Sequence, residues 1–163
     1  MINSPKSNIF ESSKHQTKLF GYDNHLNLFE RFYTKKDLPK VTLFSGPKGL
    51  GKSTFVFHLI NYFLSFSENN AYSIKTKSIN SENSSYKLIL ENIHPNFYLV
   101  EKLEEKKFIS IDEIRKLSFF LNKTTYGSNF KFIFIKDLEN LNQNSSNALL
   151  KILENGDAST FFL

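Results

Sequence analysis

A glycine-rich stretch with a lysine and a hydroxyl residue, GPKGLGKST from Gly46 to Thr54, has the composition of a phosphate-binding loop. It satisfies the pattern G-x-x-x-x-G-K-[ST] through Gly46, Gly51, Lys52 and Ser53. The glycines allow backbone angles that turn several N–H groups toward one anion, and Lys52 can reach the terminal phosphates. Ser53 would offer one oxygen to a Mg²⁺ ion. The stretch therefore predicts binding of ATP or ADP.

The residues on either side of this stretch predict the elements that a phosphate loop needs. The apolar run before it, residues 40–45, predicts a buried strand, and the apolar positions of residues 51–66 recur at helical spacing. The helix adds the positive end of its dipole to the anion site. A glycine turn that merely joins a strand to a helix would not explain Lys52 and Ser53 together. All nine residues are candidate nucleotide contacts: Gly46, Pro47, Lys48, Gly49, Leu50, Gly51, Lys52, Ser53 and Thr54.

A second apolar run, FKFIFI at residues 130–135, is the most strand-like stretch of the chain, and Lys136 and Asp137 follow it. P-loop NTPases usually place one carboxylate after such a strand to hold Mg²⁺ and a second one to activate water. In register, Lys136 stands in the metal-binding position and Asp137 in that of the base. Lysine there opposes Mg²⁺ binding unless its side chain turns outward. The sequence therefore predicts nucleotide binding with weak or absent hydrolysis, and Asp137 is the candidate catalytic residue.

Strands are predicted at residues 40–45, 97–100, 130–135 and 159–163, and helices alternate with them. This order predicts an α/β fold with a mostly parallel central sheet covered on both faces. Local signals predict where the helices begin and end. They are Asp23 or Asn24 as an N-cap, a capping box of Ser110 and Glu113, and a left-handed C-cap at Asn155 and Gly156.

The organisation predicted along the chain is a single domain. Residues 1–18 are expected to be a flexible N-terminal segment, and residues 19–163 a nucleotide-binding domain. Residues 67–85, which are rich in Ser and Asn, are expected to be a surface insertion. A strand at the end of the sequence, with no helix after it, predicts a fold truncated before its last strands.

Composition excludes several classes of protein. The chain has 163 residues and a formal charge of +5, which permits an anionic partner such as nucleic acid without requiring one. It contains no cysteine, which excludes disulfides and thiolate metal sites and fits a reducing cytoplasm. The sequence has no apolar stretch long enough to cross a membrane, so we expect a soluble, cytoplasmic protein. The four histidines lack ligand spacing, and His94 before Pro95 is expected to fix a turn.

Taken together, these segments resemble the delta-prime family of clamp-loader subunits of bacterial DNA polymerase III, which are of AAA+ type. The resemblance covers nearly the whole chain from Leu19. Its most specific pieces are His94-Pro95-Asn96, the segment Ile111 to Arg115 (IDEIR), and the segment Asn147 to Glu154 (NALLKILE).

The resemblance implies a three-layer P-loop AAA+ type sandwich and a place in a hetero-pentamer with gamma/tau and delta subunits. It also implies a role in loading the sliding clamp onto primed DNA for the polymerase holoenzyme. The nucleotide site of delta-prime is often degenerate, whereas gamma/tau subunits keep Asp-Glu after the strand, so Lys136 fits delta-prime better. The family's sensor residue, arginine finger, helical lid and collar would lie beyond Leu163.

Two alternatives stay open at this stage. An active ATPase of gamma/tau type would need a carboxylate at position 136, and the sequence has a lysine there. An unrelated P-loop kinase or switch would need further arginines in a lid, and Arg31 and Arg115 are the only two in the chain.

Overall fold

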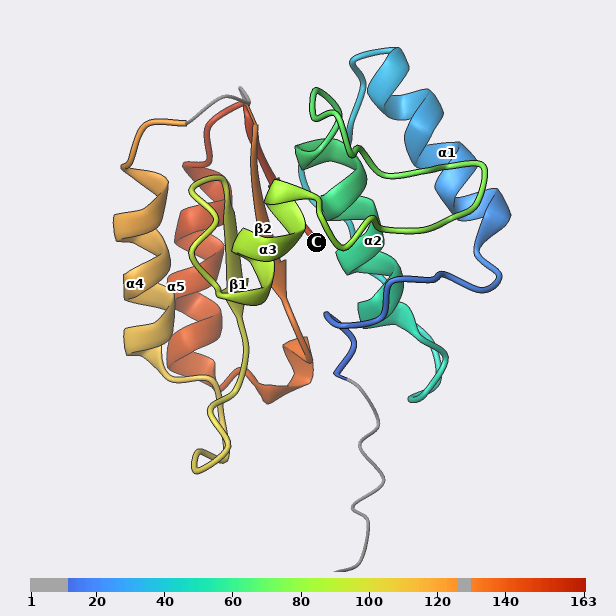
Figure 1. Ribbon diagram of the computed structural model, residues 1–163. Coiled ribbons are helices and arrows are strands. Elements are labelled where there is room, and N and C mark those ends of the chain that lie inside the picture. Colours follow the sequence, from blue (N-terminus) through green and yellow to red (C-terminus); the bar gives the residue numbers. More distant parts are fainter. Residues whose placement is uncertain (1–11, 126–129) are drawn as a thin grey trace, which may run out of the picture.

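The computed structural model describes residues 12–125 and 130–163. A three-stranded parallel sheet runs in the order β1-β2-β3. Helices α4 and α5 cover one face of this sheet, and α2 covers the other with α1 outside it (Figure 1). The predicted α/β class with a parallel sheet is confirmed. The elements are α1 (Asp23–Thr34), α2 (Lys52–Leu64), α3 (Ser84–Leu90), β1 (Phe97–Val100), α4 (Ile111–Leu121), β2 (Lys131–Ile135), the 3-10 turn η1 (Leu138–Asn140), α5 (Gln143–Glu154) and β3 (Thr160–Phe162).

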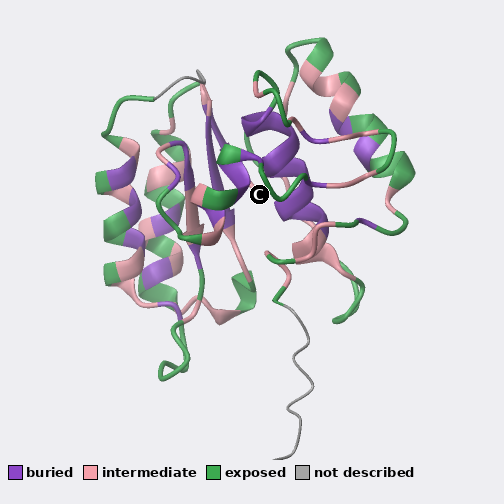
Figure 2. Cartoon of the chain, in the orientation of Figure 1, coloured by how far each residue is buried: buried purple, intermediate pink, exposed green. Residues whose placement is uncertain are grey.

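The central strand β2 is buried (Figure 2). Its side chains alternate between two cores, one on each face of the sheet. Phe132 stacks on Phe63 of α2 with ring centroids 5.2 Å apart, and Phe134 meets Phe57 edge-on at 5.4 Å. Ile133 points to the opposite face, into the core that α4 and α5 share. Successive strand residues point to opposite faces, so one short strand holds both layers of helices.

Residues 40–45 differ from the predicted buried strand. Only Val41 forms a bridge, a parallel one to Phe162 of β3. Thr42 N donates to the Phe162 carbonyl at 2.9 Å, and Phe162 N donates to the Lys40 carbonyl at 2.7 Å. Val41 is 56% exposed and Leu43 72% exposed. Among the described residues the segment pairs with a neighbour on one side only. Phe44 packs partly buried against Phe29 and Phe55, so one face of the segment is covered and the face with Val41 and Leu43 is not.

The helix ends follow the local signals in part. Ser110 Oγ accepts from Glu113 N at 3.3 Å, which confirms Ser110 as the N-cap of α4. The Glu113 carboxylate accepts from Lys116 at 2.7 Å, and no bond from it back to the Ser110 amide is formed, so the capping box is only half present. At the end of α5 neither Asn155 nor Gly156 is left-handed. Asn155 Nδ2 instead donates to a carbonyl of the last turn, which satisfies the helix end without a left-handed residue.

The predicted N-cap of α1 is wrong. The N-cap is Tyr22, whose backbone is left-handed with φ 59° and ψ 16°, and it makes no side-chain cap. Asp23 lies in the first turn, where its negative charge suits the helix dipole, and it accepts from Lys77 at 2.7 Å. Lys77 belongs to the insertion. The carboxylate that was predicted to cap α1 therefore pairs with the insertion instead.

The insertion at residues 67–85 lies on the surface but has buried anchors. Tyr72, Ile79 and Asn83 are each less than a tenth exposed. Glu68 reaches across to the start of α3, where its carboxylate accepts from Ser84 N at 2.8 Å and Ser85 N at 3.0 Å. This contact satisfies two of the free amides of a helix N-terminus.

Part of the segment predicted to be flexible packs against the domain. Residues 1–11 lie outside the described residues. Within residues 12–18, Lys14 Nζ donates to the Leu90 carbonyl at 2.9 Å, and the Gln16 carbonyl accepts from His58 Nε2 at 3.0 Å. Ile79 N also donates to the Thr17 carbonyl at 2.9 Å, so residues 12–18 close over α2 and the insertion.

Two buried histidines also form hydrogen bonds within the domain. His58 Nδ1 lies 3.1 Å from the Tyr72 hydroxyl, and its Nε2 donates to a backbone carbonyl. His94 Nδ1 accepts from Asn96 N at 3.1 Å, which supports the expectation that His94 fixes the turn before β1. Burial lowers the pKa of both histidines to about 4, from an ordinary value of 6.5. Both rings are therefore neutral in the folded protein at neutral pH.

Acid should destabilise the fold through these histidines. Below pH 6.5 these histidines bind protons in the unfolded chain, whereas in the folded chain they stay neutral down to about pH 4. The free energy of unfolding that the protein has above pH 6.5 therefore decreases as the pH falls. The loss at pH 5 should be about 2 kcal/mol for each histidine. Urea unfolding of His58→Gln at pH 7 and pH 5 should therefore show a smaller acid loss than the parent. The exposed His25→Gln should show the parent's loss, and equal losses in His58→Gln and the parent would contradict the assignment.

Candidate nucleotide-binding site

The glycine loop adopts backbone angles that its glycines are needed for. Gly46 has φ 145°, Gly49 φ 88° and Gly51 φ 79°, all in the region that L-residues with a side chain rarely adopt. Gly51 is the N-cap of α2, and its carbonyl accepts the helix's first amide bond, from Phe55 N at 2.9 Å. The loop thus ends at a helix N-terminus, where free amides and the dipole favour an anion.

Lys52 lies across this loop. Its ammonium donates to the Gly46 carbonyl at 2.7 Å and to the Pro47 carbonyl at 2.9 Å. These two bonds hold the side chain over the loop, where a phosphate bound to the loop amides would meet the third ammonium proton. Ser53 follows in the first turn of α2 and lines the same cleft as Lys52.

Tyr22, the N-cap of α1, supports the loop through a contact that sequence reasoning missed. Its hydroxyl donates to the Leu50 carbonyl at 2.7 Å. Its ring stacks on Phe55 of α2 with centroids 4.8 Å apart and an interplanar angle of 13°. The left-handed backbone of Tyr22 turns the chain so that this ring reaches the loop. A short Gly-Tyr-Asp sequence was the one available signal, and it indicates a turn without indicating its partner.

The lysine after β2 does not face the loop. Lys136 Nζ lies 3.3 Å from Glu101 Oε2, in the segment that follows β1, and Lys136 is not among the residues that line the cleft. Asp137 does line the cleft, together with Ser53 and Lys52. The backbone of Asp137 is left-handed, with φ 55° and ψ 61°. The sequence left open whether the Lys136 side chain turns outward, and in this structure it lies against Glu101 and outside the cleft lining.

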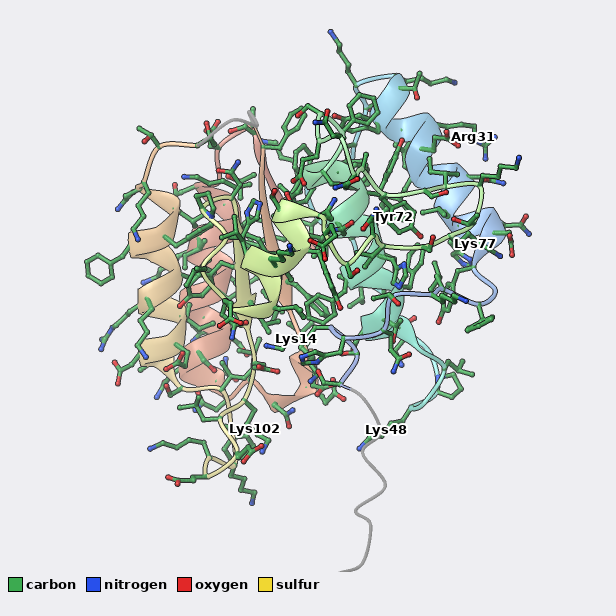
Figure 3. The ribbon with its side chains drawn as sticks, viewed as in Figure 1. Lys14, Arg31, Lys48, Tyr72, Lys77 and Lys102 are labelled. Carbon is green, nitrogen blue, oxygen red and sulfur yellow. The ribbon has the colours of Figure 1, made fainter. Side chains whose placement is uncertain are left out.

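A cleft of about 1110 Å³ lies between the glycine loop and the end of β2. Lys48 from the loop and Lys102 from the segment after β1 line it, and both are at the lower end of the molecule in Figure 3. With Lys52 they bring three ammonium groups to the lining, against the two carboxylates of Asp137 and Glu139. The charge balance of the described lining favours a polyanion.

The predicted residues divide between the lining and its support. Gly46, Lys48, Lys52 and Ser53 line the cleft. The carbonyls of Pro47 and Leu50 hold Lys52 and Tyr22, and Gly51 starts the helix. Gly49 supplies a turn with positive φ. Thr54 is partly buried in the first turn of α2.

These residues fit a nucleotide with its metal ion. The loop amides and Lys52 suit phosphate oxygens, and the oxygens of Ser53 and Asp137 are ligand types that Mg²⁺ prefers. No group of three or more histidine, aspartate or glutamate side chains within residues 12–125 and 130–163 could hold a metal ion without such phosphates.

The left-handed conformation of Gly51 gives a direct test of the loop geometry. A Cβ at this position would meet only Tyr22, at 4.0 Å, so Gly51→Ala should cost backbone strain without a clash. We expect about 1–2 kcal/mol less free energy of unfolding, measured by urea denaturation. Gly156→Ala, where φ is not positive and the nearest atoms are 3.5 Å away, should be neutral or slightly stabilising. A Gly51→Ala variant as stable as the parent would contradict the geometry.

Comparisons with known proteins show the family of the chain. The family model for "DNA polymerase III, delta subunit" matches residues 21–163. A DNA polymerase III subunit delta' of Pseudomonas aeruginosa is 29% identical over 121 residues, which cover 74% of this chain and 35% of that protein. The same-named subunit of Buchnera aphidicola is 26% identical over 134 residues, covering 81% of this chain and 38% of that protein. The chain therefore spans about a third of the length of these relatives.

A solved structure gives a weaker likeness. The crystal structure of a DNA polymerase III gamma subunit-related protein from Thermotoga maritima has a TM-score of 0.38 and 25% identity, covering 46% of this chain and 27% of that one. This overlap is too partial to carry an argument. Within the part of the chain that the structure describes, no helix has the length and apolar character needed to cross a membrane. Because the family model matches nearly all of the sequence, the chain belongs to the DNA polymerase III delta subunit family.

Proposed function

We propose that this chain is the nucleotide-binding part of a clamp-loader subunit of delta-prime type in the DNA polymerase III holoenzyme. In this role it binds ATP or ADP at the glycine loop and hydrolyses ATP poorly. Its partners are gamma/tau and delta subunits in a hetero-pentamer that places the sliding clamp on primed DNA. The names of the relatives and the family match support the clamp-loader part of the proposal.

One observation carries the nucleotide part. A loop with three positive-φ glycines ends at the N-terminus of α2, and Lys52 lies over it on two loop carbonyls. This arrangement suits the β- and γ-phosphates of a nucleotide, since loop amides, helix dipole and ammonium converge on one anion. A linking turn would need neither the lysine nor its position.

Poor hydrolysis follows from the carboxylates at the end of β2. A competent P-loop ATPase uses one carboxylate for the metal shell and another for the attacking water. Here the residue after β2 is Lys136, paired with Glu101, and the carboxylates that line the cleft, Asp137 and Glu139, stand one and three residues beyond the usual metal-binding position. As a base, Asp137 is one methylene shorter than the usual glutamate. It remains the candidate catalytic residue.

Nucleotide binding is tested on the full-length protein by titration with a fluorescent ADP analogue. Lys52→Ala should weaken binding at least about tenfold, because a charged hydrogen bond to phosphate contributes about 1.5–3 kcal/mol. Lys75→Ala removes one exposed positive charge from the insertion and should bind as the parent does. Equal binding by Lys52→Ala and the parent would overturn the loop as the nucleotide site.

Hydrolysis is measured as phosphate release by the same preparation. We expect the parent to bind nucleotide and to release phosphate no faster than the background rate of Lys52→Ala. Rapid release by the parent alone, lost in Lys52→Ala, would favour the gamma/tau type of ATPase instead.

The clamp-loader role is tested by assembly. The full-length protein, mixed with gamma/tau and delta subunits of the same organism, should elute with them as one complex in gel filtration, and the complex should load the clamp on primed DNA. Loading at full rate when this protein is left out would contradict the role.

A further inference from the structure

Lys136 and Asp137, the two residues that follow β2, differ in their surroundings. In the register of P-loop proteins, position 136 supplies the metal's carboxylate, and here Lys136 stands there and leans to Glu101, 3.3 Å away. Lys136 is a third exposed and Glu101 nearly half exposed, so solvent weakens this pair, but it fixes a direction for the ammonium. The ammonium thus lies beside the segment after β1, and Lys136 is not among the residues that line the cleft.

The backbone then changes course at the next residue. In a continued strand the side chains of positions 136 and 137 would point to opposite faces. β2 ends at Ile135, and Asp137 is left-handed with φ 55° and ψ 61°, so the alternation does not continue. Asp137 lines the cleft together with Ser53 and Lys52. Aspartate tolerates this backbone region better than most residues, and Asn tolerates it equally well.

We propose that Asp137 supplies the protein carboxylate for the magnesium ion of a bound nucleotide, while Glu101 holds Lys136 away from that ion. This inference rests on the proposed nucleotide site. Ser53 would provide the second protein oxygen, and phosphate oxygens and water would complete a shell of the kind Mg²⁺ adopts. The metal position shifts by one residue along the chain relative to the usual pattern.

The role of Asp137 as a metal ligand would explain why nucleotide is bound and ATP is not hydrolysed. A carboxylate that coordinates or orients a cation is not free to take a proton from water. If Asp137 holds the metal, the two register positions after β2 offer no second carboxylate to act as the base, since the other position, 136, is a lysine. The shifted ligand keeps the nucleotide bound with its metal and leaves the water unactivated.

The test compares nucleotide affinity with and without metal in the full-length protein. A fluorescent ADP analogue is titrated in the presence of Mg²⁺ and again in EDTA, and the ratio of the two dissociation constants is the readout. The parent should bind about tenfold more tightly with Mg²⁺, and Asp137→Asn should bring the ratio close to one with the affinity in EDTA kept or improved. Asn fits the left-handed backbone, so circular dichroism should show an unchanged fold.

Two matched variants separate coordination from charge. Glu139→Gln removes the other carboxylate of the cleft lining, and its Mg²⁺ ratio should fall less than that of Asp137→Asn. Glu101→Gln releases Lys136 and should lower the ratio several-fold through repulsion of the metal, with binding in EDTA unchanged or tighter. A Glu139→Gln ratio that falls as far as that of Asp137→Asn would mean a general charge effect and would overturn the assignment.

The remaining outcomes distinguish this inference from the proposed function. A parent that binds nucleotide equally with and without Mg²⁺, or an Asp137→Asn variant that keeps the full ratio, would overturn the metal assignment alone. A parent that binds no nucleotide in either solution would overturn the nucleotide site, and the metal assignment with it.

Discussion

The two-sided burial of β2 is the constraint on which the arrangement depends. Phe132 and Phe134 pack on α2, and Ile133 packs on α4 and α5, so the strand cannot slip by one residue without exchanging aromatic and aliphatic side chains between the cores. The register with β1 places Val100 beside Ile135. The same alignment brings the segments after both strands to one edge of the sheet. The glycine loop that starts α2 meets them there, and the cleft forms between them.

The pairing of the strands also decides the electrostatics of that edge. Because Val100 and Ile135 are neighbours, Glu101 and Lys136 follow them at adjacent positions and their charges can meet. A pair of this kind on the surface contributes little to stability. The pair instead orients the Lys136 side chain, because an ammonium held at Glu101 does not repel a cation at the phosphates. The sheet register thus makes a lysine compatible with a position where its charge would otherwise oppose magnesium.

Much of this fold follows from local sequence, and the exceptions have a common cause. The glycine loop, the strands at residues 97–100 and 131–135, and Ser110 as an N-cap were predictable because their signals lie within a few residues. Residues 40–45 were predicted to form a buried strand and do not, since burial depends on neighbours rather than on a segment's own apolar residues. Gly156 is a helix-end glycine without a left-handed angle, because Asn155 satisfies the last turn by its side chain.

The site shows the same division. The loop residues of the candidate site could be predicted by type and spacing, but the contacts that orient them could not. Tyr22 reaches Leu50 across 28 positions, and Lys136 reaches Glu101 across 35. The direction of the Lys136 side chain decides whether its charge opposes a metal ion, and its position in the sequence does not give that direction. The sequence shows which residue follows a strand. The direction of that residue's side chain depends on the partner that strand pairing places beside it.

The insertion and residues 12–18 extend this dependence to α2, the helix that carries the loop. Polar residues of α2, His58 and Asn61, are fully buried, and their partners lie in residues 12–18, in the insertion, and at the start of α3. A buried polar group left without its partner is costly, so these segments must stay closed for α2 to keep its place. Stability of the insertion is therefore coupled to the position of the glycine loop, even though no residue of the insertion lines the cleft among the described residues. A Ser- and Asn-rich segment that looks dispensable in the sequence is, in physical terms, part of the support of the site.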